Sequence, residues 1–349
     1  GGQAVMEGVM MRSPKFMAVA VRRANGRMVI RSHRVTSVAE RFWLFKKPIV
    51  RGVVTLIESM VNGIGALSFS AQIASEDEVA VENVKSDASA VKAEKVEALS
   101  STAIAMSMFT AFALGIGLFV ALPHGLAAIA TGQLGITADS PLFHLLDGLF
   151  KLIILLTYVY LIGQLPDIFR VFQYHGAEHQ SIYAFEKNLD LTVDNADQQI
   201  PLHPRCGTSF LFFLVLISVI VFSIALPVLG LTHLSENKWL NHVAMVLVKI
   251  GLMLPVAGLS YEFIKACAFR MDQVVFRAMI WPGMMLQKLT TRKPDRNQLE
   301  VALASLKQVL RLEKTPAEQV TDETLKDFEI GSIAELTPVN AAVREFLEN

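Results

Sequence analysis

Residues Thr208 to Leu231 read TSFLFFLVLISVIVFSIALPVLGL, a stretch without a charged side chain. A helix of about 20 apolar residues crosses the hydrocarbon core of a bilayer, so this stretch predicts a transmembrane helix. Three other stretches are similarly long and apolar: Thr102 to Leu122, Leu142 to Leu165 and Trp239 to Cys267. We therefore predict an all-α polytopic membrane protein with about four transmembrane helices.

The composition supports this class. The 349 residues are 52% hydrophobic and 18% charged, whereas soluble domains carry about 25% charged residues. Two cysteines, Cys206 and Cys267, are too few for a disulfide framework. The basic N-terminal region has few aromatic residues placed to stack on bases, so anionic lipid headgroups explain its charge better than nucleic acid does. The expected partner is the lipid bilayer, and homo-oligomerisation stays open.

The distribution of lysine and arginine predicts the topology. The loop over 123–141 has neither residue, and the loop over 232–241 has only Lys238. In contrast, the first 51 residues carry eleven. Cytoplasmic segments carry the excess of positive charge, so we expect a multi-pass protein of the cytoplasmic membrane. Both termini and the loop over 166–207 are expected in the cytoplasm.

The segments outside the spans have weaker patterns. Phe16 to Val21 and Met28 to Val35 are strand-like, and Asn25-Gly26 between them is a favoured two-residue hairpin turn. These runs predict a small cytoplasmic β-hairpin head. The predicted divisions are the head over 1–51, an amphipathic or re-entrant helix over 52–74, an acidic flexible linker over 75–101, transmembrane helices over 102–165 and 208–268, a His/Cys metal-site loop over 166–207, and a cytoplasmic amphipathic tail over 269–349 with a helix from Asn297 to Leu312.

A short motif, YHGAEH from Tyr174 to His179, could bind a metal ion. On a helix, His175 and His179 lie on one face, and Glu178 lies one turn from His175. Two imidazoles one turn apart can share a metal ion, and a neighbouring carboxylate can activate water. The spacing is that of the inverted zincin motif, His-x-x-Glu-His. The motif therefore predicts a site for zinc or a similar divalent metal.

A second pair of candidate ligands, His203 and Cys206, lies in the same loop, separated by two residues. Four protein ligands would close a tetrahedral site, and closed sites are usually structural, whereas a catalytic site keeps one position open. Glu262, near the cytoplasmic end of the last span, is the candidate to replace part of this set in a catalytic site. The sequence leaves both types of site open.

Charged residues also occur inside the predicted spans. Asp147 and Lys151 are four residues apart in the second span, and Lys249 is near the middle of the fourth. Charges at this depth are unfavourable and usually mark function. They could serve a transporter, but a structural pair between Lys249 and Asp147 is the favoured interpretation.

Long stretches of the chain resemble the YqhQ family of bacterial membrane proteins. The matching stretches are Gly1 to Arg12, Arg51-Gly52, Tyr174 to His179, Leu191 to Val193, Leu202 to Phe210, Val256 to Glu262, Leu289 to Asp295 and Glu300 to Ala302. The family has relatives in plastids, has no known function and is regarded as predicted metal-dependent enzymes. The resemblance covers nearly the whole chain except 75–101, and it implies a location in the bacterial inner membrane.

Two functions follow as expectations. In the first, the protein is a metal-dependent hydrolase in which Glu178 is the general base, and its substrate is a membrane protein or a lipid. In the second, it is a membrane scaffold or assembly factor whose zinc is structural.

Overall fold

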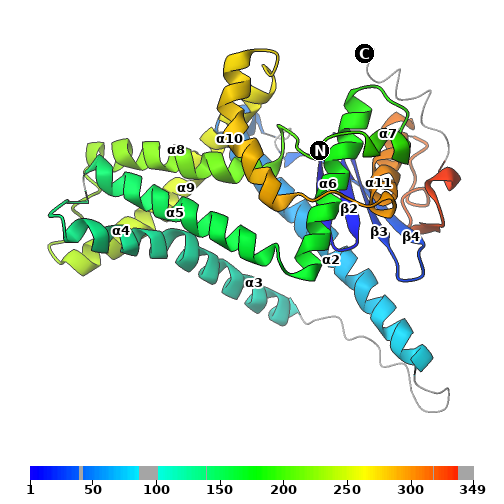
Figure 1. Ribbon diagram of the computed structural model, residues 1–349, viewed down its shortest axis with the longest axis horizontal. Helices are drawn as coiled ribbons and strands as arrows, with labels where there is room; N and C mark the ends of the chain where they lie inside the picture. The colour runs from blue at the N-terminus through cyan, green and yellow to red at the C-terminus, as the bar shows by residue number, and fades with distance from the viewer. Residues whose placement is uncertain (39–41, 86–100, 139, 317, 337–349) are drawn as a thin grey trace.

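The computed structural model describes residues 1–38, 42–85, 101–138, 140–316 and 318–336. A bundle of long apolar helices extends from a head built around a β-sheet (Figure 1). The N-terminal strands and the C-terminal helix both belong to the head, although the bundle separates them in the sequence.

The bundle contains the four predicted spans with similar bounds. Its helices are α3 (Ser101–Ile116), the π-helical segment η2 (Gly117–Ala121), α4 (Leu122–Gly132), α5 (Pro141–Ile162), α8 (Gly207–Val228) and α9 (Lys238–Ala268). α3, η2 and α4 form one continuous span candidate, Met106–Gly132. Many large apolar side chains of these helices are exposed, as expected for surfaces that face lipid.

The structure contains more candidate membrane spans than the four that the sequence predicts. Five helices among the described residues are long and apolar enough to cross a membrane, and the fifth is α2 (Val50–Lys85). The polar residues of 52–74 favour an amphipathic or re-entrant helix over a span, whereas the structure has one continuous helix there that is long enough to be a fifth candidate. α2 also extends through the first part of the predicted acidic linker, which is therefore helical over 75–85, while 86–100 lies outside the described residues.

α2 contacts both parts of the molecule. Near its start, a Cβ on Gly52 would lie 2.9 Å from the carbonyl oxygen of Gly258 on α9, so the two backbones pack closely. Further along, Ala66, Phe69 and Ile73 are buried against the sheet. A helix of 36 residues is about 54 Å long, which is enough to reach from the bundle across the head.

The head contains a five-stranded antiparallel sheet in the order β1-β2-β3-β4-β5. Its strands are β1 (Gly2–Val5), β2 (Gly8–Arg12), β3 (Phe16–Arg22), β4 (Met28–Arg34) and β5 (Phe328–Ile330). The predicted hairpin is confirmed as β3 and β4, but it is part of a larger sheet. The turn is also longer than two residues: the N–H of Arg23 donates a hydrogen bond to the carbonyl oxygen of Arg27 at 2.8 Å, and Gly26 within the turn adopts a φ of 85°.

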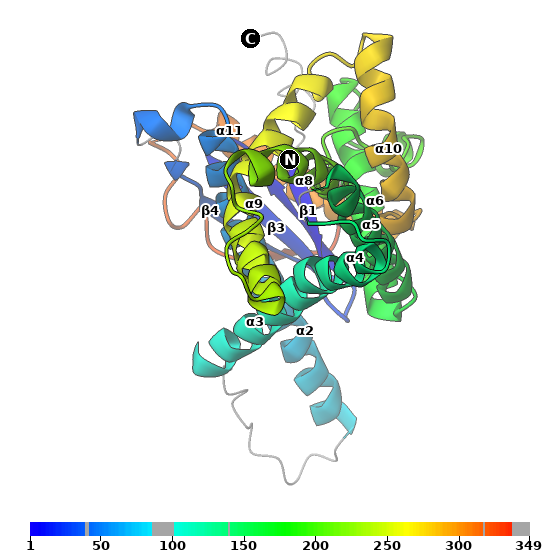
Figure 2. The ribbon, with the colours of Figure 1, turned by 90° about the vertical axis from the view of Figure 1, so that its left-hand side faces the viewer.

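Both faces of the sheet, whose strands lie behind the bundle in Figure 2, are buried. One face of β3, which includes Ala18 and Ala20, packs on α11 (Arg296–Lys314), and the opposite face, which includes Val19 and Val21, packs on α2. The predicted amphipathic tail helix is thus confirmed, and its apolar face covers the sheet. An Asp295 capping box begins α11.

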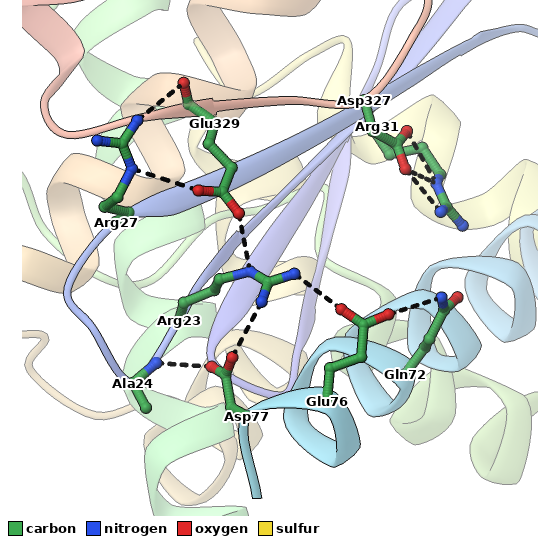
Figure 3. A network of polar contacts seen from close by, with 9 residues as sticks. All are labelled: Arg23, Ala24, Arg27, Arg31, Gln72, Glu76, Asp77, Asp327 and Glu329. Atoms are coloured by element: carbon green, nitrogen blue, oxygen red, sulfur yellow. Dashed lines mark hydrogen bonds and ion pairs between the residues drawn. The ribbon is translucent and has the colours of Figure 1, made fainter. Parts of the chain in front are cut away.

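Arg23 joins three segments of the head (Figure 3). It pairs with Glu76 at 2.8 Å and Asp77 at 3.2 Å, both on α2, and with Glu329 of β5 at 3.1 Å. Nearby, Arg31 pairs with Asp327 at 2.7 Å. The acidic residues that suggested a linker therefore hold α2 on the sheet.

The remaining helical segments lie in the head or join it to the bundle. They are α6 (Pro166–Glu186), α7 (Val193–Asp197), α10 (Val274–Thr290) and the short 3-10 segments η1 (Trp43–Lys46) and η3 (Ile333–Glu335). α6 packs on α11 and β1, and α10 packs on α8. The predicted loop over 166–207 is thus largely helical.

Candidate metal centre

Helix α6 holds the two histidines of the YHGAEH motif on one face, as predicted. The ring centroids of His175 and His179 are 4.4 Å apart. Tyr174 is buried, and its hydroxyl donates a hydrogen bond to Glu7 at 3.2 Å. A Cβ on Gly176 would lie 2.1 Å from the carbonyl oxygen of Arg292. Only glycine allows the segment after α10 to approach α6 this closely.

Cys206 completes a group of three. It is the N-cap of α8, and its Sγ lies 3.1 Å from Nε2 of His175. One potential ligand atom from each of His175, His179 and Cys206 lies within 4.8 Å of the others. Residues from α6 and from the start of α8 therefore meet at a point where one metal ion could bind.

Backbone carbonyls orient both imidazoles. Nδ1 of His175 lies 2.9 Å from the carbonyl oxygen of Thr290, and Nδ1 of His179 lies 2.6 Å from that of Pro201. A carbonyl only accepts, so each Nδ1 carries the proton. This leaves the Nε2 lone pairs for a metal, and histidine ligands are commonly oriented by such an N–H bond.

His203 lies beside this group with both nitrogens engaged elsewhere. Its Nε2 is 3.3 Å from Glu186, and its Nδ1 accepts a hydrogen bond from the backbone N–H of Arg205 at 3.3 Å. The ring packs on Tyr183, with centroids 4.8 Å apart. Burial lowers the pKa of His203 to about 4, so the ring is neutral at pH 7. The structure brings together three of the four predicted His and Cys ligands.

The two carboxylates of the prediction lie in different places. Glu178 is buried, and a Cβ on Gly2 of β1 would lie 2.9 Å from its Oε1. It is also close enough to His203 to influence that ring electrostatically. Glu262 pairs with Arg51, whose Nε lies 2.6 Å from its Oε1. The structure therefore does not bring Glu262 into the His/Cys group.

Gln287 of α10 was not identified from the sequence. Its side chain is fully buried, donates to the carbonyl oxygen of His203 at 2.7 Å and accepts from the N–H of His203 at 2.8 Å. It also donates to the hydroxyl of Ser209 at 2.8 Å. The available signal was a single amide in the apolar run that precedes Lys288. Thr290 and Pro201 gave no signal, because they act through backbone carbonyls.

The charged residues of the spans form a separate group inside the bundle. Nζ of Lys249 lies 2.5 Å from Oδ2 of Asp147, and Nζ of Lys151 lies 3.4 Å from the same oxygen. The pairing of Lys249 with Asp147 agrees with the favoured interpretation of these residues.

The chain was also compared with known proteins. Residues 47–312 match a family described as "Protein of unknown function (DUF1385)". The chain is 33% identical over 322 residues to "Uncharacterized protein YqhQ" of Bacillus subtilis (strain 168). The aligned residues make up 92% of that relative and 90% of this chain. No solved structure matches it. The family match and this similarity over 90% of the chain show that the chain is a member of the DUF1385 family of YqhQ-like proteins, whose function is unknown.

Proposed function

We propose that this protein is a metal-dependent hydrolase of the bacterial inner membrane that acts on a membrane-associated peptide or lipid. Its metal centre would lie at the cytoplasmic face, with His175, His179 and Cys206 as ligands. The alternative is a scaffold or assembly factor in which a structural zinc ties α6 to α8.

The ligand count carries the proposal. Three ligand atoms converge, while His203 is held by Glu186 and by the backbone of Arg205. A set of three protein ligands leaves a fourth position open, which is typical of catalytic zinc, whereas structural sites use four. This favours the hydrolase over the scaffold.

The donor set fits zinc or a similar divalent ion. Two imidazole nitrogens and one thiolate suit zinc, whereas magnesium and calcium prefer oxygen. Such an ion would polarise a carbonyl or phosphoryl oxygen and lower the pKa of water. Glu178 is the group of this chain that would accept the proton from water, because it is buried on the same helix, one turn after His175.

The contacts of α2 support the predicted topology. Its second half is covered by the sheet, and its start packs on the C-terminal half of α9. We infer that α2 runs from the membrane surface over the head and that the other four candidates cross the bilayer. An even number of spans places both termini on one side, and the eleven cations of the first 51 residues make that side cytoplasmic. A reporter fused near Asn195 should then report the cytoplasm, and one near Gly132 the opposite side.

Cobalt substitution tests the ligand set. Purified full-length protein should bind about one Co²⁺ per chain and show thiolate-to-cobalt charge transfer. Cys206→Ala should lose that band, and Cys267→Ala, which removes the other buried cysteine, should keep it. Full Co²⁺ binding with an unchanged band in Cys206→Ala would contradict the site.

The open position separates the two functions. Azide should change the visible spectrum of the Co²⁺ protein if one position is open, and His203→Gln should leave both the spectrum and the azide response intact. A spectrum that is insensitive to azide and altered by His203→Gln would favour the closed, structural site. Glu178→Gln should keep the metal, but the rate of the catalysed reaction should fall by about 10²-fold or more. The variant should then fail in a complementation assay.

A further inference from the structure

A buried chain of ionisable side chains lies in the bundle, away from the metal centre. It begins at the group formed by Asp147, Lys151 and Lys249, in which Asp147 and Lys249 are almost completely inaccessible. Two ammonium groups face one carboxylate, so one positive charge is unbalanced when all three are ionised. Oδ1 of Asp147 also has no hydrogen-bond partner among the described residues. A purely structural pair would need neither feature.

Two histidines extend this group toward the surface. Nζ of Lys249 lies 3.0 Å from Nδ1 of His124 on α4, and Nε2 of His124 lies 3.1 Å from Nδ1 of His242. An ammonium group only donates, so Nδ1 of His124 must accept, and its Nε2 carries a proton that it donates to His242. Lys249 therefore fixes the direction of these hydrogen bonds, each of which is donated toward His242.

The chain reaches the end of the bundle that is farthest from the head. His242 is half-buried and lies in the second turn of α9, which begins at Lys238 in the loop opposite the sheet (Figure 1). His124 is buried, as are Lys249 and Asp147 further inside. A proton could thus pass from the accessible end at His242 to a site enclosed by the bundle.

Aromatic rings surround the inner part of the chain. Nζ of Lys249 lies 5.3 Å from the ring centroid of Phe143 and 5.6 Å from that of Phe222. α3 and α8 contain no titratable residue, and His144 is the other buried titratable side chain on α5. The ionisable groups that act electrostatically on Asp147, Lys249 and His124 are all members of this same buried series of side chains. Among the described residues, the walls therefore offer protons no other charged acceptor.

We propose that His242, His124 and Lys249 form a proton-transfer chain that loads and unloads the buried group around Asp147. In release, an Nζ–H bond of Lys249 breaks and its proton moves to Nδ1 of His124. The Nε2 proton of His124 moves to Nδ1 of His242, and the Nε2 proton of His242 moves to water. Lys249 becomes a neutral amine, both imidazoles stay neutral with exchanged tautomers, and the buried group loses its unbalanced charge. Uptake is the reverse.

This gives the protein a proton-binding function that is separate from the metal centre and does not depend on it. A buried site that alternates between a positive and a neutral state would bind an anion or a proton-coupled solute differently in its two states. The entrance through His242 makes the alternation respond to pH on the side of the membrane opposite the head.

Nitrogen-15 NMR of the reconstituted full-length protein, labelled in histidine and lysine, tests the chain. From about pH 5 to about pH 10, Lys249 should titrate, and His124 should change from the Nε2–H to the Nδ1–H tautomer at the same midpoint. Lys249→Met should abolish the pH dependence of the His124 tautomer. A His124 tautomer that stays constant over this range in the wild type overturns the proposal, and this result requires no variant to fold.

Exchange with water tests the entrance. His242→Gln keeps an acceptor for His124 but cannot pass a proton, so exchange of the Lys249 protons with water should slow by about 10²-fold, the lower range for a positioned proton-transfer group. His233→Gln, an exposed histidine in the preceding loop, is the matched control and should exchange at the wild-type rate. Equal rates in His242→Gln and the wild type would exclude His242 as the entrance.

Discussion

The side chain of Gln287 forms two reciprocal hydrogen bonds with the backbone of His203, one to its carbonyl oxygen at 2.7 Å and one from its N–H at 2.8 Å. α10 thus holds the segment that carries Cys206, although it contributes no ligand itself. The same helix ends at Thr290, whose carbonyl oxygen orients His175. The candidate metal centre therefore depends on three helices, of which the motifs in the sequence identify two.

We expect Gln287→Leu to weaken the candidate metal centre without removing a ligand. Loss of the amide leaves two buried backbone groups without partners, which costs about 1–3 kcal/mol each. Affinity for Co²⁺ should fall by about 10- to 100-fold, as for other groups that position ligands. Titration with Co²⁺ and thermal unfolding measure the two effects. Gln164→Ala, at an exposed glutamine, should change neither.

Gly176→Ala should destabilise the junction between α6 and the segment that leads to α11. The added methyl would lie 2.1 Å from the carbonyl oxygen of Arg292, so that segment must move, at a cost of about 1–3 kcal/mol. Gly251→Ala on α9, where nothing lies within 4 Å of the added atom, should be neutral or slightly stabilising. Equal melting temperatures for the two variants would contradict this packing.

Acid should destabilise the head through His203. Burial lowers its folded pKa to about 4, while the unfolded value is about 6.5. Below pH 6.5 the unfolded chain binds the extra proton, so stability falls as the pH decreases from about 6.5 to about 4 and changes little further below. The contribution is about 3 kcal/mol at most. Unfolding of the wild type and His203→Gln over this range should differ in slope, with the shallower slope in the variant.

Arg23→Ala should loosen α2 and β5 together. Arg23 pairs with Glu76, Asp77 and Glu329 and is only 22% exposed, so the variant should lose more than the 0–1 kcal/mol of a single surface pair. Hydrogen exchange should accelerate at the end of α2 and in β5 alike. Arg27→Ala is the matched control, because Arg27 is 50% exposed and, among the described residues, forms an ion pair only with Glu329. Acceleration in only one of the two segments would contradict a shared anchor.

The membrane helices were predictable because a bilayer requires long runs of apolar residues, and four such runs appear in the sequence. α2 was harder to assign, since its second half buries Phe69 and Ile73 on a sheet while presenting acidic residues to Arg23. β5 has only three residues, and its position depends on pairing with β4, about 300 residues earlier. No local pattern identifies such a strand.

For the candidate site, helical spacing was sufficient to place His175 beside His179. Cys206 was among the candidates to join them, but the choice between Cys206, His203 and Glu262 was not predictable. The separation of His203 from the group, for example, depends on Glu186, seventeen residues earlier. The orienting carbonyls of Thr290 and Pro201 have no sequence signature at all, since every residue carries a carbonyl.

The pairing of β5 with β4 also has a consequence for biosynthesis. The ribosome completes β1 to β4 long before it makes Phe328–Ile330, and all the membrane helices emerge in between. During that time the edge of β4 and the face that α11 will cover are unprotected, and such edges invite aggregation. Final assembly of the head must therefore wait until the bundle has been inserted, which makes the nascent N-terminal region a candidate client for chaperones at the membrane.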